Sequence, residues 1–298
     1  MSNQKVIVTK GLPASGKTTW SKEWVAKDPT NRVRVNKDDL RSMLHGGKYS
    51  KGNEKQIISI QEEIIKDSLI KGKSIVVDDT NLATQKDGLN KHWVRIVNVV
   101  MSLDKSIWSN TSIDIKKFNV EPEECIKRDL KRANSVGSDV IWRMYWQNVA
   151  VIKAPVHNPH ISNCIIVDID GTLAQMNGRH PFQWDKVGED LVRTPIKRIV
   201  DAYHHLGYTI ILMSGRDAVC KQETIDWLDF NCISYDKLFM RPEGNCEKDT
   251  VIKERLYTEN IEGNYNVLLV VDDRPSVIRM WTKLGLPVVS AEPTTWEF

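Results

Sequence analysis

A glycine-rich segment near the start of the chain has the spacing of a phosphate-binding loop. Residues Gly11 to Thr18 read Gly-Leu-Pro-Ala-Ser-Gly-Lys-Thr, which fits the pattern G-x-x-x-x-G-K-[ST] at every fixed position. In such a loop, backbone N–H groups surround a nucleotide phosphate, the lysine reaches the β and γ oxygens, and the final hydroxyl ligates Mg²⁺. The segment therefore predicts a site for ATP and Mg²⁺ in which Thr18 ligates the metal. The predicted ATP-binding residues are Gly11, Ser15, Gly16, Lys17 and Thr18.

A short apolar strand, Val33–Val35, runs into two acidic residues and an arginine. At the carboxyl end of a parallel strand, where ligands bind in open α/β sheets, Asp38 could take the proton of an acceptor hydroxyl. Arg41 could hold a phosphate of the same acceptor. The alternative is that Asp38 only caps a helix and that Arg41 lies in its solvated first turn. Beside a phosphate loop, the pattern favours a kinase with Asp38 as its base.

Further charged residues of the first half fit the same site. Asp78 and Asp79 end another apolar strand, a position that can hold Mg²⁺ or its waters. Asp79 could instead orient Arg41 through a bidentate pair, and the sequence leaves both roles open. Arg128 and Arg132 stand one turn apart on a predicted helix. They could close over a triphosphate as a lid, or form only a solvated basic face.

In the second half, an apolar strand ends in Asp168-Ile169-Asp170-Gly171-Thr172. Alternate carboxylates at a strand end repel each other unless a cation neutralises them, so we predict both Asp168 and Asp170 as Mg²⁺ ligands. With Mg²⁺ between Asp168 and a substrate phosphate, Asp168 can attack phosphorus and form an aspartyl-phosphate. Asp170 can protonate the leaving oxygen and later activate water. The pattern predicts a Mg²⁺-dependent phosphatase.

Three later segments supply the groups that such a site still needs. A strand leads into Ser214-Gly215-Arg216, whose hydroxyl and guanidinium can hold phosphate oxygens. Lys253, on a predicted helix, can neutralise the charge of the aspartate and the phosphate. Asp272 and Asp273 end a further strand and can provide the remaining metal ligand. In this order after Asp168, the segments favour a phosphatase site over unrelated strand ends.

These residues must be positioned by strands that alternate with helices, which indicates parallel sheets covered on both faces. Residues 153–160 carry two prolines and no periodicity before a new strand begins. We therefore expect two α/β domains: a P-loop parallel-sheet kinase at 1–152, a linker at 153–162, and a Rossmann-like phosphatase at 163–298. The predicted strands are Lys5–Thr9, Val33–Val35, Ser74–Val77, Ile96–Val100, Cys164–Val167, Thr209–Met213 and Val267–Val271. The predicted helices include Thr19–Lys27, Asn53–Lys71 and Asp249–Leu256.

Composition bounds the function. The 298 residues are 41% hydrophobic and 27% charged, enough for two sizeable cores. The net charge of +3 hides a first half of +8, with 26 basic against 18 acidic residues, and a second half of −5, with 16 against 21. A basic half suits a polyanionic partner. Without a membrane-spanning run, a secretory signal or a disulfide pattern in the five cysteines, we expect a cytoplasmic protein with no membrane contact.

The second half resembles the haloacid dehalogenase superfamily of aspartate-nucleophile phosphotransferases, through the four motifs just described. Over nearly its full length the chain resembles the bacteriophage polynucleotide 5′-kinase/3′-phosphatases, which repair broken nucleic-acid ends. That wider resemblance is carried by Gly11–Thr18, Asn36–Arg41, Asp79–Asn81, Lys127–Arg132, Val167–Arg179, Ser214–Arg216 and Asp272–Arg274.

The resemblance implies a role for each matching residue. Lys17 and Thr18 bind ATP, Asp38 is the general base for a 5′-hydroxyl, Arg41 holds the neighbouring phosphate, and Arg132 stabilises the transferring phosphate. In the phosphatase, Asp168 is the nucleophile and Asp170 the general acid-base, supported by Arg179, Arg216, Asp249, Lys253, Asp272 and Asp273. The resemblance also implies a homotetramer that acts on DNA or RNA ends, with a 3′-phosphate or 2′,3′-cyclic phosphate as the second substrate, ahead of a nucleic-acid ligase.

Two other functions fit parts of the pattern. A small-metabolite kinase fused to a small-molecule phosphatase would act without regard to polynucleotide length or salt. A nucleic-acid-binding adaptor switched by a nucleotide would explain the phosphate loop and the basic half. It would not explain a complete set of phosphatase residues.

Overall fold

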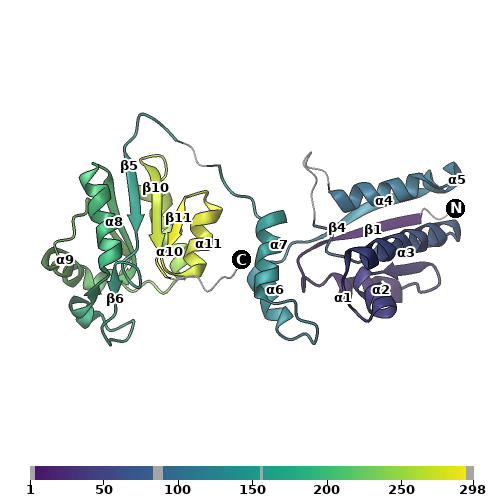
Figure 1. Cartoon of the computed structure of the whole chain (residues 1–298), viewed down its shortest axis with the longest axis horizontal. Helices are drawn as coiled ribbons and strands as arrows, with labels where there is room; N and C mark the ends of the chain where they lie inside the picture. Colours follow the sequence, from purple (N-terminus) through teal and green to yellow (C-terminus); the bar gives the residue numbers. More distant parts are fainter. Residues whose placement is uncertain (1–3, 83–89, 155–156, 293–298) are drawn as a thin grey trace. The chain divides into compact units, whose positions relative to one another are not determined.

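The computed structural model describes residues 4–82, 90–154 and 157–292. The chain forms two compact units, Met1–Ala150 and Val151–Phe298, each built on its own parallel sheet (Figure 1). The predicted fold class, two successive α/β domains, is confirmed. The domain limits drawn from the sequence stay a prediction, and residues 155–156 of the predicted linker lie outside the described residues.

The first unit has a four-stranded parallel sheet in the order β2-β3-β1-β4. Strand β1, which lies between β3 and β4, buries Val6, Ile7 and Val8 in succession, as expected of a strand covered on both faces. The elements are β1 (Gln4–Gly11), α1 (Lys17–Ala26), β2 (Arg32–Val35), α2 (Lys37–His45), α3 (Lys51–Ile70), β3 (Ser74–Val77), α4 (Lys91–Met101), α5 (Lys105–Trp108), β4 (Thr111–Phe118), α6 (Pro122–Asp129) and α7 (Ser138–Asn148).

The predicted strand Ile96–Val100 is wrong, because these residues lie in helix α4. Ile96, Val99 and Val100 are buried at helical spacing and join the core that α3 also contributes to. A short apolar run fits a strand or one face of a helix equally well. The fourth strand is instead β4, which the sequence did not reveal because it lies at the sheet edge with several exposed residues.

The second unit has a five-stranded parallel sheet in the order β11-β10-β5-β8-β9, and β6 and β7 form a separate antiparallel pair. The two edge strands β9 and β11 were not predicted. The elements are β5 (Asn163–Val167), β6 (Ala174–Gln175), η1 (Trp184–Glu189), β7 (Leu191–Val192), α8 (Thr194–His205), β8 (Thr209–Asp217), η2 (Ala218–Cys220), α9 (Lys221–Phe230), β9 (Lys237–Arg241), α10 (Asp249–Asn260), β10 (Asn266–Asp272), α11 (Pro275–Lys283) and β11 (Val288–Ser290).

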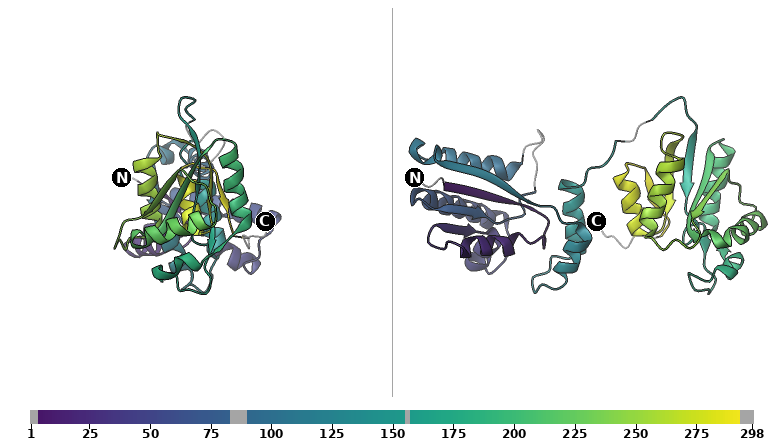
Figure 2. Two further views of the ribbon diagram at one scale, coloured as in Figure 1. Left: turned by 90° about the vertical axis from the view of Figure 1, so that its left-hand side faces the viewer. Right: turned by 180° about the vertical axis from the view of Figure 1, so that it is seen from behind.

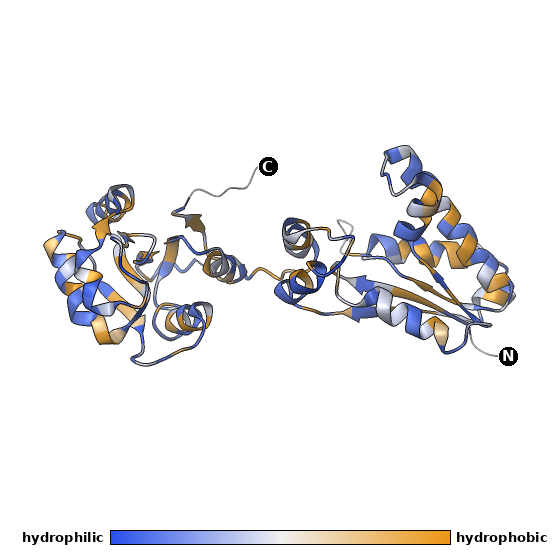
Figure 3. Ribbon diagram, turned by 90° about the horizontal axis from the view of Figure 1, so that it is seen from below, coloured by the Kyte–Doolittle hydropathy of each residue, from blue (hydrophilic) through white to orange (hydrophobic). Residues whose placement is uncertain are grey.

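Alternate residues of β5 pack into two different cores, one on each face of its sheet. Ile165 and Val167 join the core that α8 and α9 cover, whereas Cys164 and Ile166 join the core that α10 and α11 cover. Helix α8 lies on one side of the sheet and α10 and α11 lie on the other (Figure 2). Hydrophobic residues gather along the strands and on the helix sides that face them (Figure 3). None of the helices in the described ranges is long and apolar enough to cross a membrane.

Both sheets bring the predicted functional residues to one edge. In the first unit, the phosphate loop follows β1, and the acidic pairs follow β3, which neighbours β1, and β2, which lies beyond β3. In the second unit, Asp168 follows β5, which lies between β8 with Ser214 and β10 with Asp272. Because parallel strands end at a common edge, residues far apart in sequence meet there.

Candidate active sites

The phosphate loop turns sharply between β1 and α1. Ala14 and Gly16 have positive φ angles of 58° and 97°, in the region that favours glycine. A side chain on Gly11 would place its Cβ 2.8 Å from the Ser15 Oγ and 2.9 Å from the Phe118 Cβ, so this position needs glycine as well. The loop borders a cleft of about 990 Å³, which is also lined by Thr18, Asn36, Asp38, Arg41, Asp78, Asp79, Arg128 and Arg132.

Lys17 is a buried cation without an acidic partner. Its Nζ donates to the Leu12 carbonyl at 2.6 Å and reaches the Ser15 Oγ at 3.4 Å, and no carboxylate of the described residues forms an ion pair with it. Burial lowers its pKa to about 8, although Asp78 acts in the opposite direction. A nucleotide phosphate in the cleft would supply the missing negative charge.

The acceptor side of the cleft is formed by the start of α2. Asn36 caps this helix by accepting from the Asp39 N–H at 2.9 Å, so the alternative that Asp38 is the cap is wrong. The Asp38 side chain is 82% exposed and pairs with Arg41 Nη1 at 2.5 Å. The second Arg41 nitrogen, Nη2, lies 2.8 Å from Glu54 on α3. The structure thus brings an exposed carboxylate and the guanidinium that pairs with it together at the cleft.

The two acids after β3 have different surroundings. Asp79 accepts from the Lys37 backbone N–H at 3.0 Å and from Gln61 Nε2 at 2.8 Å, and burial raises its pKa. It makes no pair with Arg41 in the described structure, so it anchors α2 to α3 instead. Asp78 pairs through Oδ2 with Arg34 at 2.6 Å, but its buried Oδ1 has no partner. Asp78 and Asp79 both line the cleft, and no pattern in the sequence favours Asp78 over Asp79 as the residue with an unpartnered oxygen.

Arg128 and Arg132 both line the cleft, but they do not share a helix. Helix α6 ends at Asp129, whose Oδ2 accepts from Ser135 Oγ and from two backbone N–H groups that follow. These bonds turn the chain, so Arg132 lies just beyond the helix end and the predicted one-turn spacing on a helix is wrong. Both side chains are about half exposed, with ion pairs to Glu124 at 2.8 Å and Asp129 at 3.3 Å.

In the second unit, three carboxylates converge at the sheet edge. Asp168, Asp272 and Asp273 offer oxygens that all lie within 4.8 Å of one another. Lys253 Nζ lies 2.7 Å from Asp168 Oδ1 and 2.8 Å from Asp272 Oδ2. The single ammonium of Lys253 cannot balance three carboxylates, so a divalent cation would neutralise the remaining charge. Carboxylate oxygens are the ligands that Mg²⁺ prefers. The donor set therefore fits the metal that the sequence predicts.

Glycine at position 171 is required by this cluster. Gly171 has a φ of 81°, and a Cβ there would lie 2.2 Å from Asp273 Oδ2. Burial raises the pKa of Asp168 well above its usual range, and repulsion from Asp272 adds to the effect. Burial opposes the charge on Lys253, but the attraction of Asp168 and Asp272 outweighs it and raises the lysine pKa. The ammonium therefore stays charged beside the carboxylates.

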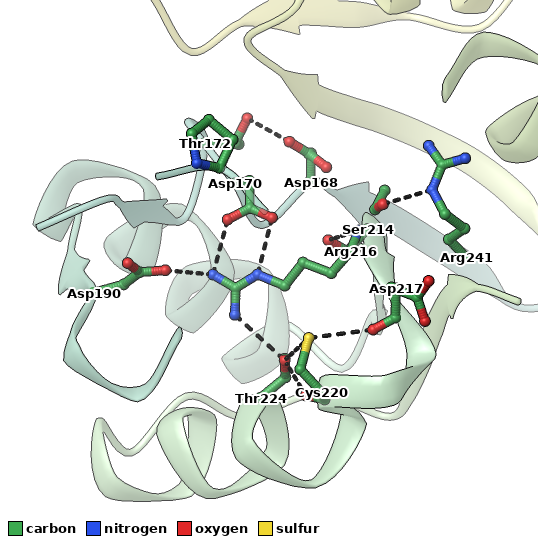
Figure 4. Close-up of polar contacts among 12 residues, drawn as sticks. Asp168, Asp170, Thr172, Asp190, Ser214, Arg216, Asp217, Cys220, Thr224 and Arg241 are labelled. Atoms are coloured by element: carbon green, nitrogen blue, oxygen red, sulfur yellow. Dashed lines mark hydrogen bonds and ion pairs between the residues drawn. The ribbon is translucent and has the colours of Figure 1, made fainter. Parts of the chain in front are cut away.

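Asp170 is not one of the three converging carboxylates, and its side chain faces the Arg216 guanidinium (Figure 4). Arg216 holds its carboxylate through Nε and Nη2, both at 2.9 Å, and Arg179 Nη2 adds a third contact at 2.8 Å. Behind them, the buried Asp190 accepts from Arg179 Nε at 2.7 Å and from Arg216 Nη2 at 2.6 Å. The sequence predicted the Asp170 carboxylate as a metal ligand, but the structure commits it to these guanidinium groups.

The two arginines differ from their predicted role. Arg216 is fully buried and Arg179 is 7% exposed, so neither guanidinium is an open phosphate-binding group. Each guanidinium instead donates hydrogen bonds to both Asp170 and Asp190, and so bridges the two carboxylates. No sequence motif pointed to Asp190, because its importance comes only from long-range pairing with residues 11 and 26 positions away.

The remaining predicted residues border the same site. Ser214 is fully buried and accepts from the Arg216 N–H at 3.2 Å. Asp249, at the start of α10, packs so closely on Gly215 that a Cβ there would lie 2.3 Å from Asp249 Oδ1. Arg241 Nε donates to the Gly215 carbonyl at 2.8 Å, a contact that the sequence did not suggest.

Together these features define a P-loop nucleotide-binding unit and an aspartate-based phosphatase unit. Residues 6–144 match the family model of the AAA domain, and residues 162–296 match that of the "Polynucleotide kinase PNKP phosphatase domain". Each half thus matches one family model, and the second match bears out the resemblance to polynucleotide kinase/phosphatases.

A curated relative covers both halves. The "Putative bifunctional polynucleotide kinase/RNA ligase" of Autographa californica nuclear polyhedrosis virus is 30% identical over 314 residues, which is 97% of this chain and 42% of the relative. The chain thus spans less than half the length of this relative. Two solved structures of Pnkp1/Rnl/Hen1 complexes, one described as an RNA repair complex, contain chains that are 27% identical. They cover 97% and 99% of this chain and 96% and 99% of their own, with TM-scores of 0.46 and 0.48.

Proposed function

We propose that this chain heals broken nucleic-acid ends. The first unit transfers the γ-phosphoryl group of ATP to a 5′-hydroxyl, and the second removes a 3′-phosphate or a 2′,3′-cyclic phosphate. The observation that carries this proposal is the presence of two separate phosphoryl-transfer sites in one chain, the second in a unit of the polynucleotide kinase phosphatase family.

In the kinase, the residues mainly position reactants and balance charge. Lys17 holds the β and γ oxygens, and Arg128 and Arg132, which line the same cleft, contact the phosphates as well. Arg41 holds a phosphate of the acceptor. The oxygen of the 5′-hydroxyl bonds to the γ-phosphorus while the bond to the leaving ADP oxygen breaks. Asp38 takes the proton of that hydroxyl.

In the phosphatase, Asp168 attacks the 3′-phosphate. Lys253 and Thr172 fix its carboxylate, with contacts of 2.7 Å and 3.2 Å. As the Asp168 oxygen bonds to phosphorus, the bond to the 3′-oxygen breaks, and Asp170 acts as the general acid that supplies a proton to that oxygen. Asp170 then accepts a proton from the water that hydrolyses the aspartyl-phosphate.

Mg²⁺ fits both sites. The Thr18 hydroxyl and the orphaned Asp78 Oδ1 would hold it in the kinase, and Asp168, Asp272 and Asp273 in the phosphatase. When bound, Mg²⁺ withdraws charge from phosphate oxygens and so eases attack on phosphorus. The ligase in the name of the viral relative supports transfer of the healed ends to a ligase. The homotetramer that the resemblance implies stays a prediction.

A single incubation tests the proposed function. An oligonucleotide with a 5′-hydroxyl and a 3′-phosphate is mixed with labelled ATP, Mg²⁺ and the protein, and both ends are analysed. We expect the 5′ end to gain the label and the 3′ end to lose its phosphate. Equal phosphorylation of nucleosides or sugars would identify a small-metabolite kinase, and binding of ATP without any turnover would identify an adaptor. Either result would overturn the proposal.

A further inference from the structure

A second cleft in the first unit has no part in the sites described so far. It lies between α3 and α4, two helices that pack against each other, and it has a volume of about 650 Å³. Its floor is partly apolar, with Ile58, Val94 and Val99. Its rim carries the polar and charged residues Lys37, Glu54, Glu62, Lys66, Lys91, His92, Arg95, Asn98 and Ser102.

The rim of this α3–α4 groove has an excess of positive charge. Four cationic residues face two carboxylates, Glu54 and Glu62. Glu62 pairs with Arg95 at 2.9 Å, and Lys66 pairs with Glu63, which does not line the groove, at 2.8 Å. Lys91 is exposed and has no ion-pair partner among the described residues. The pKa of His92 is consistent with this positive charge. Burial lowers it most, the surrounding cations lower it further, and the result is a pKa of about 4. The groove therefore suits a negatively charged ligand with apolar portions.

The groove begins where the acceptor side of the ATP cleft ends. Lys37 lines both cavities and immediately precedes Asp38. Glu54, on α3, lines the groove and pairs with Arg41 of the ATP cleft at 2.8 Å. It also pairs with Lys37 at 3.5 Å. For a strand whose 5′-hydroxyl lies at Asp38, the shared residue Lys37 marks the side of the cleft from which the following nucleotides would reach the groove. A mononucleotide would fill only the part beside Asp38.

On the basis of the kinase function proposed above, we propose that the α3–α4 groove binds the acceptor strand beyond its first nucleotide. Lys66, Lys91 and Arg95 contact the phosphates of the following nucleotides, and the apolar floor contacts their sugars and bases. A positively charged groove that follows the backbone is one part of how proteins bind single-stranded nucleic acid without reading its sequence. Longer acceptors would then be phosphorylated more efficiently than short ones.

The test compares acceptor length and groove charge in the full chain. We would measure kcat/KM for 5′-phosphorylation of a dinucleotide and a decanucleotide at several salt concentrations. The variant is Lys66→Ala/Lys91→Ala. The control is Lys55→Ala/Lys105→Ala, which removes two exposed lysines that do not line the groove. Phosphatase activity, measured in the same samples, reports that the preparations are intact.

We expect the groove variant to lose about tenfold in kcat/KM with the decanucleotide and to stay within about twofold of wild type with the dinucleotide. Its salt dependence should be shallower by about 1.4 in the log–log slope, for two lost phosphate contacts on a single strand. The control should match wild type. Equal losses of kcat/KM on both acceptors, or a decanucleotide loss no larger than that of the control, would refute strand binding by the groove. The proposed kinase function would not be affected by that result. A wild-type protein that phosphorylates neither acceptor would overturn both.

Discussion

Asp190→Asn should weaken the second unit and its phosphatase while leaving the kinase unchanged. The Asp190 carboxylate accepts three hydrogen bonds, from Arg179 Nε at 2.7 Å, Arg179 Nη2 at 2.8 Å and Arg216 Nη2 at 2.6 Å. Asparagine keeps the shape but removes the charge and turns one oxygen into a donor. Two buried guanidinium groups would then face Asp170 alone.

The size of the effect follows from the burial of the partners. The side chains of Asp190 and Arg216 are fully buried, and that of Arg179 is 1% exposed. Removing one member of such an ion pair costs about 3–5 kcal/mol in unfolding free energy. With a urea dependence of about 2 kcal/mol per molar, the midpoint of the second unit should fall by about 1.5–2.5 M. Because Asp170 loses its support, phosphatase kcat should fall by about 100-fold.

Urea unfolding and the two activities, measured on one preparation, check this prediction. A suitable control is Asp201→Asn, which removes a partly exposed carboxylate that pairs with Lys197 at 2.9 Å on α8. Loss of that surface pair should cost about 0.5 kcal/mol. If Asp190→Asn were indistinguishable from Asp201→Asn in both midpoint and phosphatase kcat, the buried network would have no role in holding Asp170.

Gly171→Ala should lower phosphatase activity by about 100-fold and weaken its Mg²⁺ dependence, because the new Cβ displaces Asp273. Gly263→Ala, with a similar φ of 79° and open space around it, is the control in a Mg²⁺ titration, and equal effects of both variants would refute the steric argument. In the first unit, the unfolded chain binds a proton at His92 more readily than the folded chain, whose His92 pKa is about 4 against the usual 6.5. Stability should therefore fall as the pH drops below 6.5, by about 1 kcal/mol at about pH 5 after allowance for solvent screening. Urea unfolding of His92→Gln should lack this loss, and an equal loss in that variant would exclude His92 as its source.

The parts of the account that the sequence could predict are local in the chain. The phosphate loop and the run from Asp168 to Thr172 each fix a backbone turn and a set of side chains within a few residues. The strands that lead into them are buried apolar runs, which a period-two or continuous pattern identifies. Since parallel strands share an edge, even the meeting of Asp168 with Asp272 could be expected.

The parts that the sequence could not predict depend on which side chains pair across the fold. Arg216 looked like a phosphate ligand because it ends a strand beside the site, but Asp190 draws it into the interior. Likewise, nothing in the pair Asp78-Asp79 says which carboxylate Arg34 and Gln61 will occupy. Helix α4 was mistaken for a strand because its buried face is short and β-branched.

The central claim is that one chain carries two independent phosphoryl-transfer sites, and two isosteric variants test it most directly. Asp38→Asn and Asp168→Asn would each be incubated with ATP, Mg²⁺ and an oligonucleotide bearing a 5′-hydroxyl and a 3′-phosphate, and both ends followed by mass spectrometry. We predict that Asp38→Asn lowers 5′-phosphorylation by at least about 100-fold and leaves 3′-phosphate removal intact. Asp168→Asn should do the reverse. Loss of both activities in either folded variant, or of neither, would contradict the account.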